Sequence, residues 1–432
     1  MTITFIGHGY VGLVTACIFA DFGNDVWVVG HTPAKIDRLK SGDPIIYEPG
    51  LKELLEKNLK ANRIHFTLDF KEAVSVSDIV FITVGTPPMA TGEADLSAVF
   101  KVAENIGKNL KDGFTVVSCK STVPVGTNKK VYEILNKEKS AGATVAVASC
   151  PEFLREGTGL YDTLNPDRVV IGTESEEAVE LLINLHKPLN GKRIITDLAS
   201  AELIKYTANA MLATKISFAN LISFYCEHTG ADVETVLDAV GLDKRIGRIF
   251  LYPGVGYGGS CLPKDVKAIL NTGKNYGFDV AYLEAVESVN KAARENLLQK
   301  ILANSKGKKL AIWGLSFKPD TDDIREAPST YILDALLKEG FELSVYDPAA
   351  MENIKKIYGD KLSFHSNPYD AVKDANGLCI LTEWNEFKQA DLKKVKSLLK
   401  DTIVFDGRNI YTLDQMKKLG FHYISTGRQP VV

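Results

Sequence analysis

Near its start the chain reads Ile3-Thr4-Phe5-Ile6-Gly7-His8-Gly9-Tyr10-Val11-Gly12, an apolar run that leads into a glycine-rich turn. Residues 13–22 continue as an apolar helical stretch. Gly7 permits a tight turn, Gly9 lets a pyrophosphate approach the backbone, and Gly12 lets the helix pack closely on the strand. This GxGxxG pattern between a strand and a helix predicts a dinucleotide-binding site, and a purely structural glycine turn is the alternative.

The second predicted strand, residues 25–29, is followed by Gly30-His31-Thr32-Pro33-Ala34-Lys35. A dinucleotide site of this kind usually has Asp or Glu here, to bind the ribose 2′-hydroxyl. Gly30 stands in its place, which removes the repulsion that would exclude a 2′-phosphate. His31, Thr32 and Lys35 could hold such a phosphate. We therefore expect NAD as the cofactor and leave NADP open. The alternative interpretation of residues 30–35 is a neutral turn that binds no phosphate and still binds NAD, less tightly.

Short apolar segments alternate with helical ones in both halves of the chain, which predicts parallel sheets covered by helices. Two long helices, at 198–227 and 280–302, are expected between these halves. The fold class is therefore α/β, with two Rossmann-like doubly wound domains joined by a long central helix. The predicted strands are residues 3–6, 25–29, 79–83, 114–119, 144–148, 310–314, 343–346, 378–382 and 402–405.

Composition narrows the class of protein. The 432 residues are 45% hydrophobic and carry a net charge of −3 without a long basic run, so neither nucleic acid nor an anionic membrane is an expected partner. No window of about 18 apolar residues predicts a membrane span. The six cysteines are scattered without metal-ligand spacing, so we expect no metal site and a reducing, cytoplasmic location.

A cysteine follows two glycines in Gly258-Gly259-Ser260-Cys261-Leu262-Pro263-Lys264-Asp265. Such a thiol is either simple packing or a nucleophile that a substrate can reach. Lys205 and Asn209 are four residues apart and share one face of the long helix. A lysine in such a helix is usually a surface residue whose stem lies along apolar groups.

Polar residues also follow two predicted strands. Thr122 comes after the strand at 114–119, and strand ends in this fold face the ligand crevice. Glu152 and Glu156 come after the strand at 144–148. They are either an exposed helical pair or groups that bind a sugar or order a water molecule.

Seven motifs occur in one order along the chain: GHGYVG, KSTVPVGT, CPEFLREG, AELIKYTANA, DKRIGRIF, GVGYGGSCLPKD and LSFKPDTDDIRE. Together they resemble the UDP-glucose/GDP-mannose dehydrogenase family, over residues 3 to about 408. KSTVPVGT and the Cys-x-x-Lys-Asp ending are most similar to members that oxidise UDP-glucose. GGSCLPKD is shared with the GDP-mannose members.

The resemblance implies three domains: a NAD-binding domain at 1–197, a helical dimerisation domain with the catalytic cysteine loop at 198–303, and a UDP-sugar-binding domain at 304–432. It implies a cytoplasmic homodimer or higher homo-oligomer. The implied reaction oxidises the sugar CH₂OH to a carboxylate with two NAD and water, through a thiohemiacetal and a thioester on Cys261. Alternative substrates are GDP-mannose and a UDP-N-acetylhexosamine. A two-electron hydroxyacid dehydrogenase and a non-catalytic dinucleotide-binding scaffold are the other classes considered.

Residue roles are carried over by the same resemblance. Cys261 is the nucleophile, Lys205 stabilises an oxyanion with Asn209 beside it, and Asp265, Thr122 and Glu152 handle water or protons. The dinucleotide is expected to contact Gly7, Gly9, Tyr10, Val11, Gly12, Gly30, His31, Lys35, Thr86, Thr122, Glu156, Lys264 and Arg325. The nucleotide-sugar is expected to contact Glu152, Phe153, Leu154, Arg155, Glu156, Lys205, Asn209, Phe250, Leu251, Tyr252, Gly258, Lys318 and Arg408, with Arg245 reaching the partner subunit's site.

Overall fold

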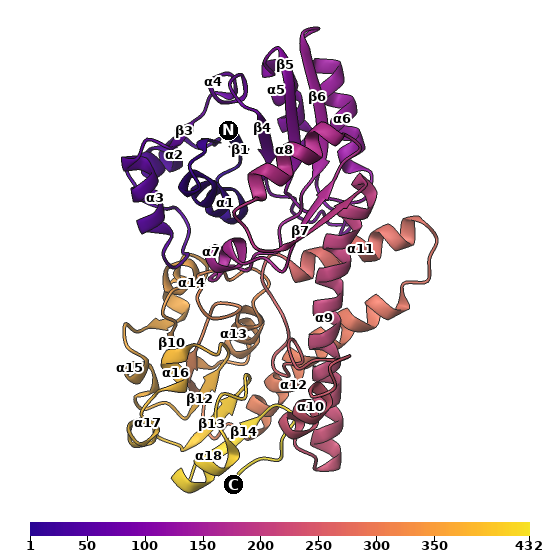
Figure 1. Cartoon of the computed structure of the whole chain (residues 1–432). Helices are drawn as coiled ribbons and strands as arrows, with labels where there is room; N and C mark the ends of the chain where they lie inside the picture. Colours follow the sequence, from indigo (N-terminus) through magenta and orange to yellow (C-terminus); the bar gives the residue numbers. More distant parts are fainter. The chain divides into compact units, whose positions relative to one another are not determined.

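The computed structural model describes residues 1–432 and divides them into two compact units (Figure 1). Unit 1 comprises Met1–Ala208 and Lys267–Thr272, and unit 2 comprises Asn209–Val266 and Gly273–Val432. Each unit has its own sheet, mostly parallel in unit 1 and parallel in unit 2, and its own apolar core. The predicted α/β class with two Rossmann-like domains is confirmed.

Unit 1 is built on an eight-stranded sheet with the order β3-β2-β1-β4-β5-β6-β7-β8. Its strands pair in parallel except β6 and β7, which are antiparallel. The order reverses between β1 and β4, and ligands of such sheets bind at the carboxyl ends of the strands flanking this point. The strands are β1 (Thr2–Ile6), β2 (Asp25–Val29), β3 (Ile64–Thr67), β4 (Ile79–Ile82), β5 (Gly113–Cys119), β6 (Ala143–Ser149), β7 (Arg168–Gly172) and β8 (Lys192–Thr196).

Helices cover both faces of this sheet, which explains why its central strands are apolar throughout. In β4, Ile79 and Phe81 belong to one apolar cluster, whereas Val80 and Ile82 belong to another. Successive side chains of a strand point to opposite faces, so the two clusters are the two halves of the core. The helices are α1 (Tyr10–Asp21), α2 (Pro33–Lys40), α3 (Leu51–Lys60), α4 (Phe70–Val74), α5 (Ser97–Asn109), α6 (Thr127–Glu138), α7 (Gly159–Leu164) and α8 (Glu176–His186).

The longest helix, α9 (Leu198–Thr229), has 32 residues and contributes to both units. It contains neither Pro nor Gly, and it ends before Gly230, which has a φ of +82°. That left-handed conformation is a common way for a helix to stop. Helix α11 (Leu262–Asn275) also contributes to both units and begins directly after Cys261.

Unit 2 holds a six-stranded parallel sheet with the order β11-β10-β9-β12-β13-β14. Its strands are β9 (Lys309–Trp313), β10 (Glu342–Tyr346), β11 (Ser363–Phe364), β12 (Gly377–Ile380), β13 (Ile403–Asp406) and β14 (His422–Ser425). Its helical elements are α10 (Val233–Gly241), α12 (Ala281–Asn304), α13 (Pro328–Lys338), α14 (Met351–Tyr358), η1 (Gly359–Lys361), α15 (Pro368–Val372), α16 (Asn385–Lys388), α17 (Leu392–Leu398) and α18 (Leu413–Leu419).

The predicted strands and both long helices are confirmed with small shifts at their ends. Strands β3, β7, β8, β11 and β14 were not predicted. Each has five residues or fewer, and β3, β8, β11 and β14 lie at sheet edges, where the apolar signal is short or interrupted. None of the helices is both long enough and apolar enough to cross a membrane.

Candidate active site

The turn between β1 and α1 is shaped to receive a phosphate. A Cβ on Gly12 would lie 2.1 Å from the carbonyl oxygen of Gly7, so a side chain there would force strand and helix apart. Gly9, in contrast, has open space where its side chain would be. Helix α1 has no side-chain cap and no acidic residue in its first turn, which leaves its N-terminal amides to an anion. These residues fit the pyrophosphate of a dinucleotide.

The loops after β4 and β5 are joined to each other by hydrogen bonds. The Thr86 hydroxyl donates to the Thr122 carbonyl oxygen at 2.9 Å, and the Ser121 hydroxyl donates to the Val84 carbonyl oxygen at 2.7 Å. Thr86 is buried and Thr122 is half-buried. The structure therefore brings together two predicted residues at the carboxyl ends of adjacent strands, where a ligand of this sheet is expected.

A buried ion pair joins α9 to the loop after β6. Lys205 Nζ lies 3.5 Å from Glu152 Oε1, and the two side chains are 5% and 9% exposed. The ammonium also lies 5.2 Å from the ring centroid of Phe153. The Leu154 backbone N–H donates to Glu152 Oε2 at 2.6 Å and fixes the carboxylate. Lys205 is thus not the surface lysine that its helix position alone would suggest.

A second buried lysine lies at the end of β5 and was missed by sequence reasoning. Lys120 is 7% exposed and donates to the Cys150 carbonyl oxygen at 3.3 Å. Burial lowers the pKa of Lys120, while Cys150 and Glu152 act in the opposite direction and Lys205 adds to the lowering. The sequence signals were its place directly after an apolar strand and at the start of the KSTVPVGT motif.

The segment after Glu152 is held by carboxylates. Glu48, a buried residue that the motifs did not point to, accepts hydrogen bonds from the backbone N–H groups of Gly157 and Gly159 at 2.7 and 2.6 Å. Glu156 is buried, so it is not part of an exposed helical pair with Glu152. Arg155 is exposed and pairs with Asp162 at 2.7 Å. These contacts anchor the predicted substrate loop at Arg155, Gly157 and Gly159.

Cys261 differs from the other cysteines in its surroundings. It is exposed, whereas the other five are buried. Burial raises the pKa of Cys17 and of Cys119 to about 12 each, which keeps both as thiols. Cys261 directly precedes α11, and its carbonyl oxygen accepts the Asp265 backbone N–H at 2.9 Å. The positive end of the helix dipole stabilises negative charge at this position.

The two glycines before Cys261 are needed for close contacts within unit 2. A Cβ on Gly258 would lie 2.4 Å from the carbonyl oxygen of Glu326. Gly259 has a φ of +83°, and a Cβ there would lie 2.7 Å from the Phe317 ring. A side chain at either position would displace the backbone that carries the thiol.

The first turn of α11, which follows Cys261, takes part in a short polar network. Asn209 Nδ2 donates to Asp265 Oδ2 at 2.5 Å, and Lys264 Nζ donates to Asp265 Oδ1 at 2.5 Å. Asp265 is only 1% exposed. The Lys264 ammonium therefore forms an ion pair with the carboxylate of the adjacent Asp265 rather than extending into solvent.

The remaining predicted residues of unit 2 have different exposures. Phe250 has a φ of +66°, a conformation that bulky residues rarely adopt and that is concentrated at functional sites. Leu251 is 2% exposed in an apolar cluster, so it can reach a ligand only through its backbone. Tyr252 is exposed and Lys318 is half-buried.

The predicted arginines of unit 2 are each held by a neighbouring acid. Arg408 donates to the Leu381 carbonyl oxygen at 2.9 Å and pairs with Glu383 at 3.2 Å. Arg325 is exposed and pairs with Asp323 at 2.7 Å. The Arg245 side chain is 88% exposed and lies 2.6 Å from an oxygen of Asp243, whose pKa it lowers through this hydrogen bond.

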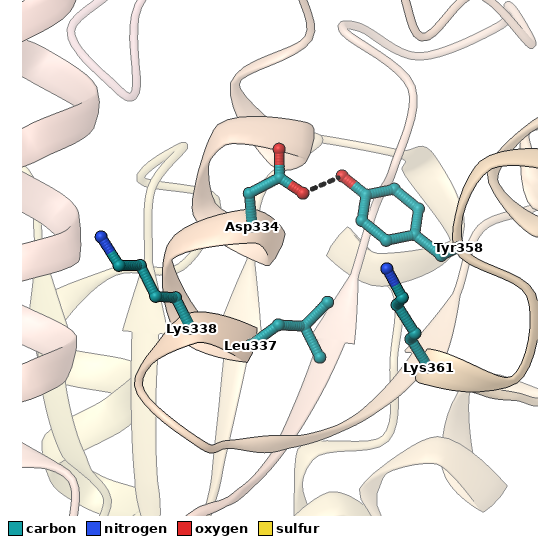
Figure 2. Close-up of a pocket in the computed structure, with 5 residues that line it drawn as sticks. All are labelled: Asp334, Leu337, Lys338, Tyr358 and Lys361. Carbon is teal, nitrogen blue, oxygen red and sulfur yellow. Dashed lines mark hydrogen bonds between the residues drawn. The ribbon is translucent and has the colours of Figure 1, made fainter.

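A surface recess of unit 2 lies apart in sequence from all of these residues. It is lined by Asp334, Leu337, Lys338, Tyr358 and Lys361 (Figure 2). The Tyr358 hydroxyl donates to Asp334 at 2.9 Å, and its pKa is raised by burial first and then by that carboxylate. No predicted site residue lines this recess, and both of its lysines are exposed to solvent.

Comparison with known proteins gives matches along almost the whole chain. Residues 1–190 match the NAD binding domain of the UDP-glucose/GDP-mannose dehydrogenase family, residues 199–292 its central domain, and residues 311–413 its UDP binding domain. UDP-glucose 6-dehydrogenase TuaD of Bacillus subtilis (strain 168) is 45% identical over 432 aligned residues, which cover 99% of this chain and 94% of that protein.

Solved structures agree with the sequence matches. A UDP-glucose dehydrogenase from the hyperthermophilic archaeon Pyrobaculum islandicum superposes with a TM-score of 0.91 at 37% identity, covering 98% of this chain and 96% of that one. A UDP-D-ManNAc dehydrogenase from Pyrococcus horikoshii superposes with a TM-score of 0.86 at 26% identity, covering 99% of both chains. The chain therefore belongs to the UDP-glucose/GDP-mannose dehydrogenase family and is an NAD-dependent dehydrogenase.

Proposed function

We propose that this enzyme oxidises UDP-glucose to UDP-glucuronate with two NAD and one water. The observation that carries the proposal is the environment of Cys261, an exposed thiol at the start of α11. The buried Asn209–Asp265 pair lies behind it. Full-length relatives that are named UDP-glucose 6-dehydrogenases support this choice of substrate.

The reaction must remove four electrons from one carbon. Bound NAD accepts a hydride, so two NAD are needed for each sugar. The balance is R–CH₂OH + 2 NAD⁺ + H₂O → R–COO⁻ + 2 NADH + 3 H⁺. An enzyme that released the aldehyde halfway would lose a reactive intermediate, and a nucleophile that retains it covalently avoids that loss.

We assign this nucleophile to Cys261. Its thiolate adds to the aldehyde carbon and forms a C–S bond, giving a thiohemiacetal. Removal of the second hydride gives a thioester, and water then cleaves the C–S bond and releases the carboxylate and the thiol. An exposed cysteine is suited to this role, because the buried cysteines are out of reach of a substrate.

Lys205 is assigned to the negative charge that develops on the substrate oxygen. Its burial supports this role, because an ammonium with little water around it acts strongly on a nearby charge. Asn209 lies one turn further along α9 and is positioned by Asp265. We assign Glu152 as the base that activates water for thioester cleavage, with Thr122 and Asp265 as further groups that position water.

The three predicted domains, 1–197, 198–303 and 304–432, are retained as a proposal. The first would bind NAD through the β1–α1 turn and the residues predicted with it, and the third would bind the UDP moiety. Within the third, Lys318 and Arg408 are the candidate contacts for the diphosphate and its sugar. A cytoplasmic location also remains a prediction.

We further propose a homodimer formed through α9. Within unit 2, Met211, Phe218 and Tyr225 follow one another at intervals of seven residues and are 57%, 48% and 63% exposed. An apolar stripe of this period on a helix is typical of a helix–helix interface. Arg245, which is exposed, is proposed to reach the site of the partner subunit.

The test pairs product stoichiometry with mass spectrometry of the intact protein. Wild type should form two NADH and one UDP-glucuronate per UDP-glucose. Cys261→Ala should form no acid but bind NAD as wild type does, and Cys226→Ala, which removes a buried cysteine, is the matched control. Two NADH per sugar from Cys261→Ala at near wild-type rate would exclude the mechanism. Faster turnover of GDP-mannose or a UDP-N-acetylhexosamine than of UDP-glucose would instead correct the substrate.

A further inference from the structure

The carboxyl end of β2 lacks the acid that usually binds the adenosine ribose of NAD. Gly30 follows the strand directly, is buried, and donates its N–H to the Thr67 carbonyl oxygen at 3.0 Å. No carboxylate takes over from a neighbouring position, because His31, Thr32 and Pro33 come next. The ribose hydroxyls at this place would therefore meet no acceptor of the usual kind.

Other side chains occupy the space that an acid at position 30 would use. A Cβ on Gly30 would lie 2.5 Å from Ile36 Cδ1 and 3.2 Å from His8 Nδ1. His8 belongs to the glycine-rich turn, is 5% exposed, and its buried Nδ1 has no hydrogen-bond partner. A polar atom buried in this way is costly unless a ligand satisfies it. The site thus presents an imidazole nitrogen in place of a carboxylate.

Two basic side chains, His31 and Lys35, lie near this imidazole. The ring centroids of His8 and His31 are 5.2 Å apart. The pKa of His8 is lowered by burial first and then by the neighbouring His31 and Lys35. Thr32 is the N-cap residue of α2 but makes no capping hydrogen bond through its side chain, and the first turn of α2 contains no acidic residue.

The acidic groups on the adjoining elements are engaged elsewhere or lie beyond the first turn. Glu72 of α4 accepts the Thr67 hydroxyl at 2.6 Å, and Asp69 caps α4. Arg38 and Asp43 pair with each other at 2.7 Å. Asp37, in the second turn of α2, is exposed to solvent. None of these acids forms an ion pair with Lys35, so its ammonium is left to a ligand at the end of β2.

We infer that this site accepts the 2′-phosphate of NADP in addition to the ribose diol of NAD. A phosphate here would receive hydrogen bonds from the Thr32 hydroxyl, from His8 and from His31, and a charge-assisted one from Lys35. It would also face the N-terminus of α2, which favours anions. The inference rests on the assignment of unit 1 as the dinucleotide site, and it extends cofactor use beyond NAD.

The experiment compares two fragments that lack the nicotinamide, 2′,5′-ADP and 5′-AMP, by titration calorimetry on the full-length enzyme at pH 7. We expect 2′,5′-ADP to bind about ten-fold more tightly, the effect of one or two charge-assisted hydrogen bonds. Lys35→Ala and His31→Ala should each remove most of this difference. Lys40→Ala, which changes an exposed lysine at the other end of α2, should retain it.

The outcomes separate this inference from the proposed function. If 5′-AMP and NAD bind but 2′,5′-ADP binds no more tightly than 5′-AMP, the 2′-phosphate site is refuted and the proposed reaction stands. An affinity difference that survives in both Lys35→Ala and His31→Ala also refutes it. If neither fragment nor NAD binds, the assignment of the dinucleotide site fails together with the inference.

Discussion

Replacing Lys205 by methionine should separate its role in the reaction from its pairing with Glu152. The two charges lie 3.5 Å apart with side chains only 5% and 9% exposed. At that distance their attraction is about 5 kcal/mol for an effective dielectric constant of about 20. Much of it is offset by the cost of burying both ions. Lys205→Met should still lower the free energy of unfolding by about 3 kcal/mol, because it leaves a buried carboxylate unpaired.

A second change, Glu152→Gln, removes that stranded charge. The double variant Lys205→Met/Glu152→Gln should therefore recover most of the lost stability. Its first turnover should remain about 10²–10³-fold slow, since methionine cannot stabilise an oxyanion. Glu152→Gln alone should keep a fast burst of NADH and then stall, because only the water-dependent step needs the carboxylate.

Stopped-flow absorbance of NADH measures the burst, and urea unfolding measures the stability. Lys101→Met is the matched control, because Lys101 pairs with Glu104 at 3.0 Å with its side chain 68% exposed. It should change neither quantity measurably. If the double variant formed NADH as fast as Glu152→Gln, Lys205 would act only by pairing with Glu152, and its assignment as an oxyanion donor would be wrong.

Three further predictions address other parts of the molecule. His186 has a pKa lowered to about 3, chiefly by burial, so the unfolded chain binds an extra proton below pH 6.5; between pH 7 and pH 5, His186→Gln should lose about 2 kcal/mol less stability than wild type in urea unfolding. Gly258→Ala should impair acid formation but not NAD binding, measured by calorimetry, because its Cβ would clash with the Glu326 carbonyl oxygen. Phe218→Asp should convert the proposed dimer into monomers in light scattering, whereas a change at the exposed Tyr161 of unit 1, Tyr161→Asp, should not; an unchanged mass for Phe218→Asp would refute the α9 interface.

Some features of this protein depend on residues that are consecutive in the chain, and others depend on contacts between residues far apart in sequence. The β1–α1 turn was predictable because strand, glycine turn and helix are consecutive in the chain, and each glycine has a local steric reason. The long helix α9 was predictable because it has an unbroken run without Pro or Gly. The edge strands were not, because their existence depends on a neighbouring strand rather than on their own two to five residues.

The sequence by itself determined the α/β class, the family and the identity of Cys261 as a candidate nucleophile, since these depend on residues close together in the chain or on motifs that keep their order. Only the tertiary structure decided which lysines are buried. Lys205 and Lys120 are buried because segments far apart in sequence pack around them. The residues next to each lysine in the chain do not predict this burial. The structure alone also placed His8 next to Gly30. The two residues lie in the turns after β1 and β2, which are adjacent strands, so residues distant in sequence meet at the carboxyl end of the sheet.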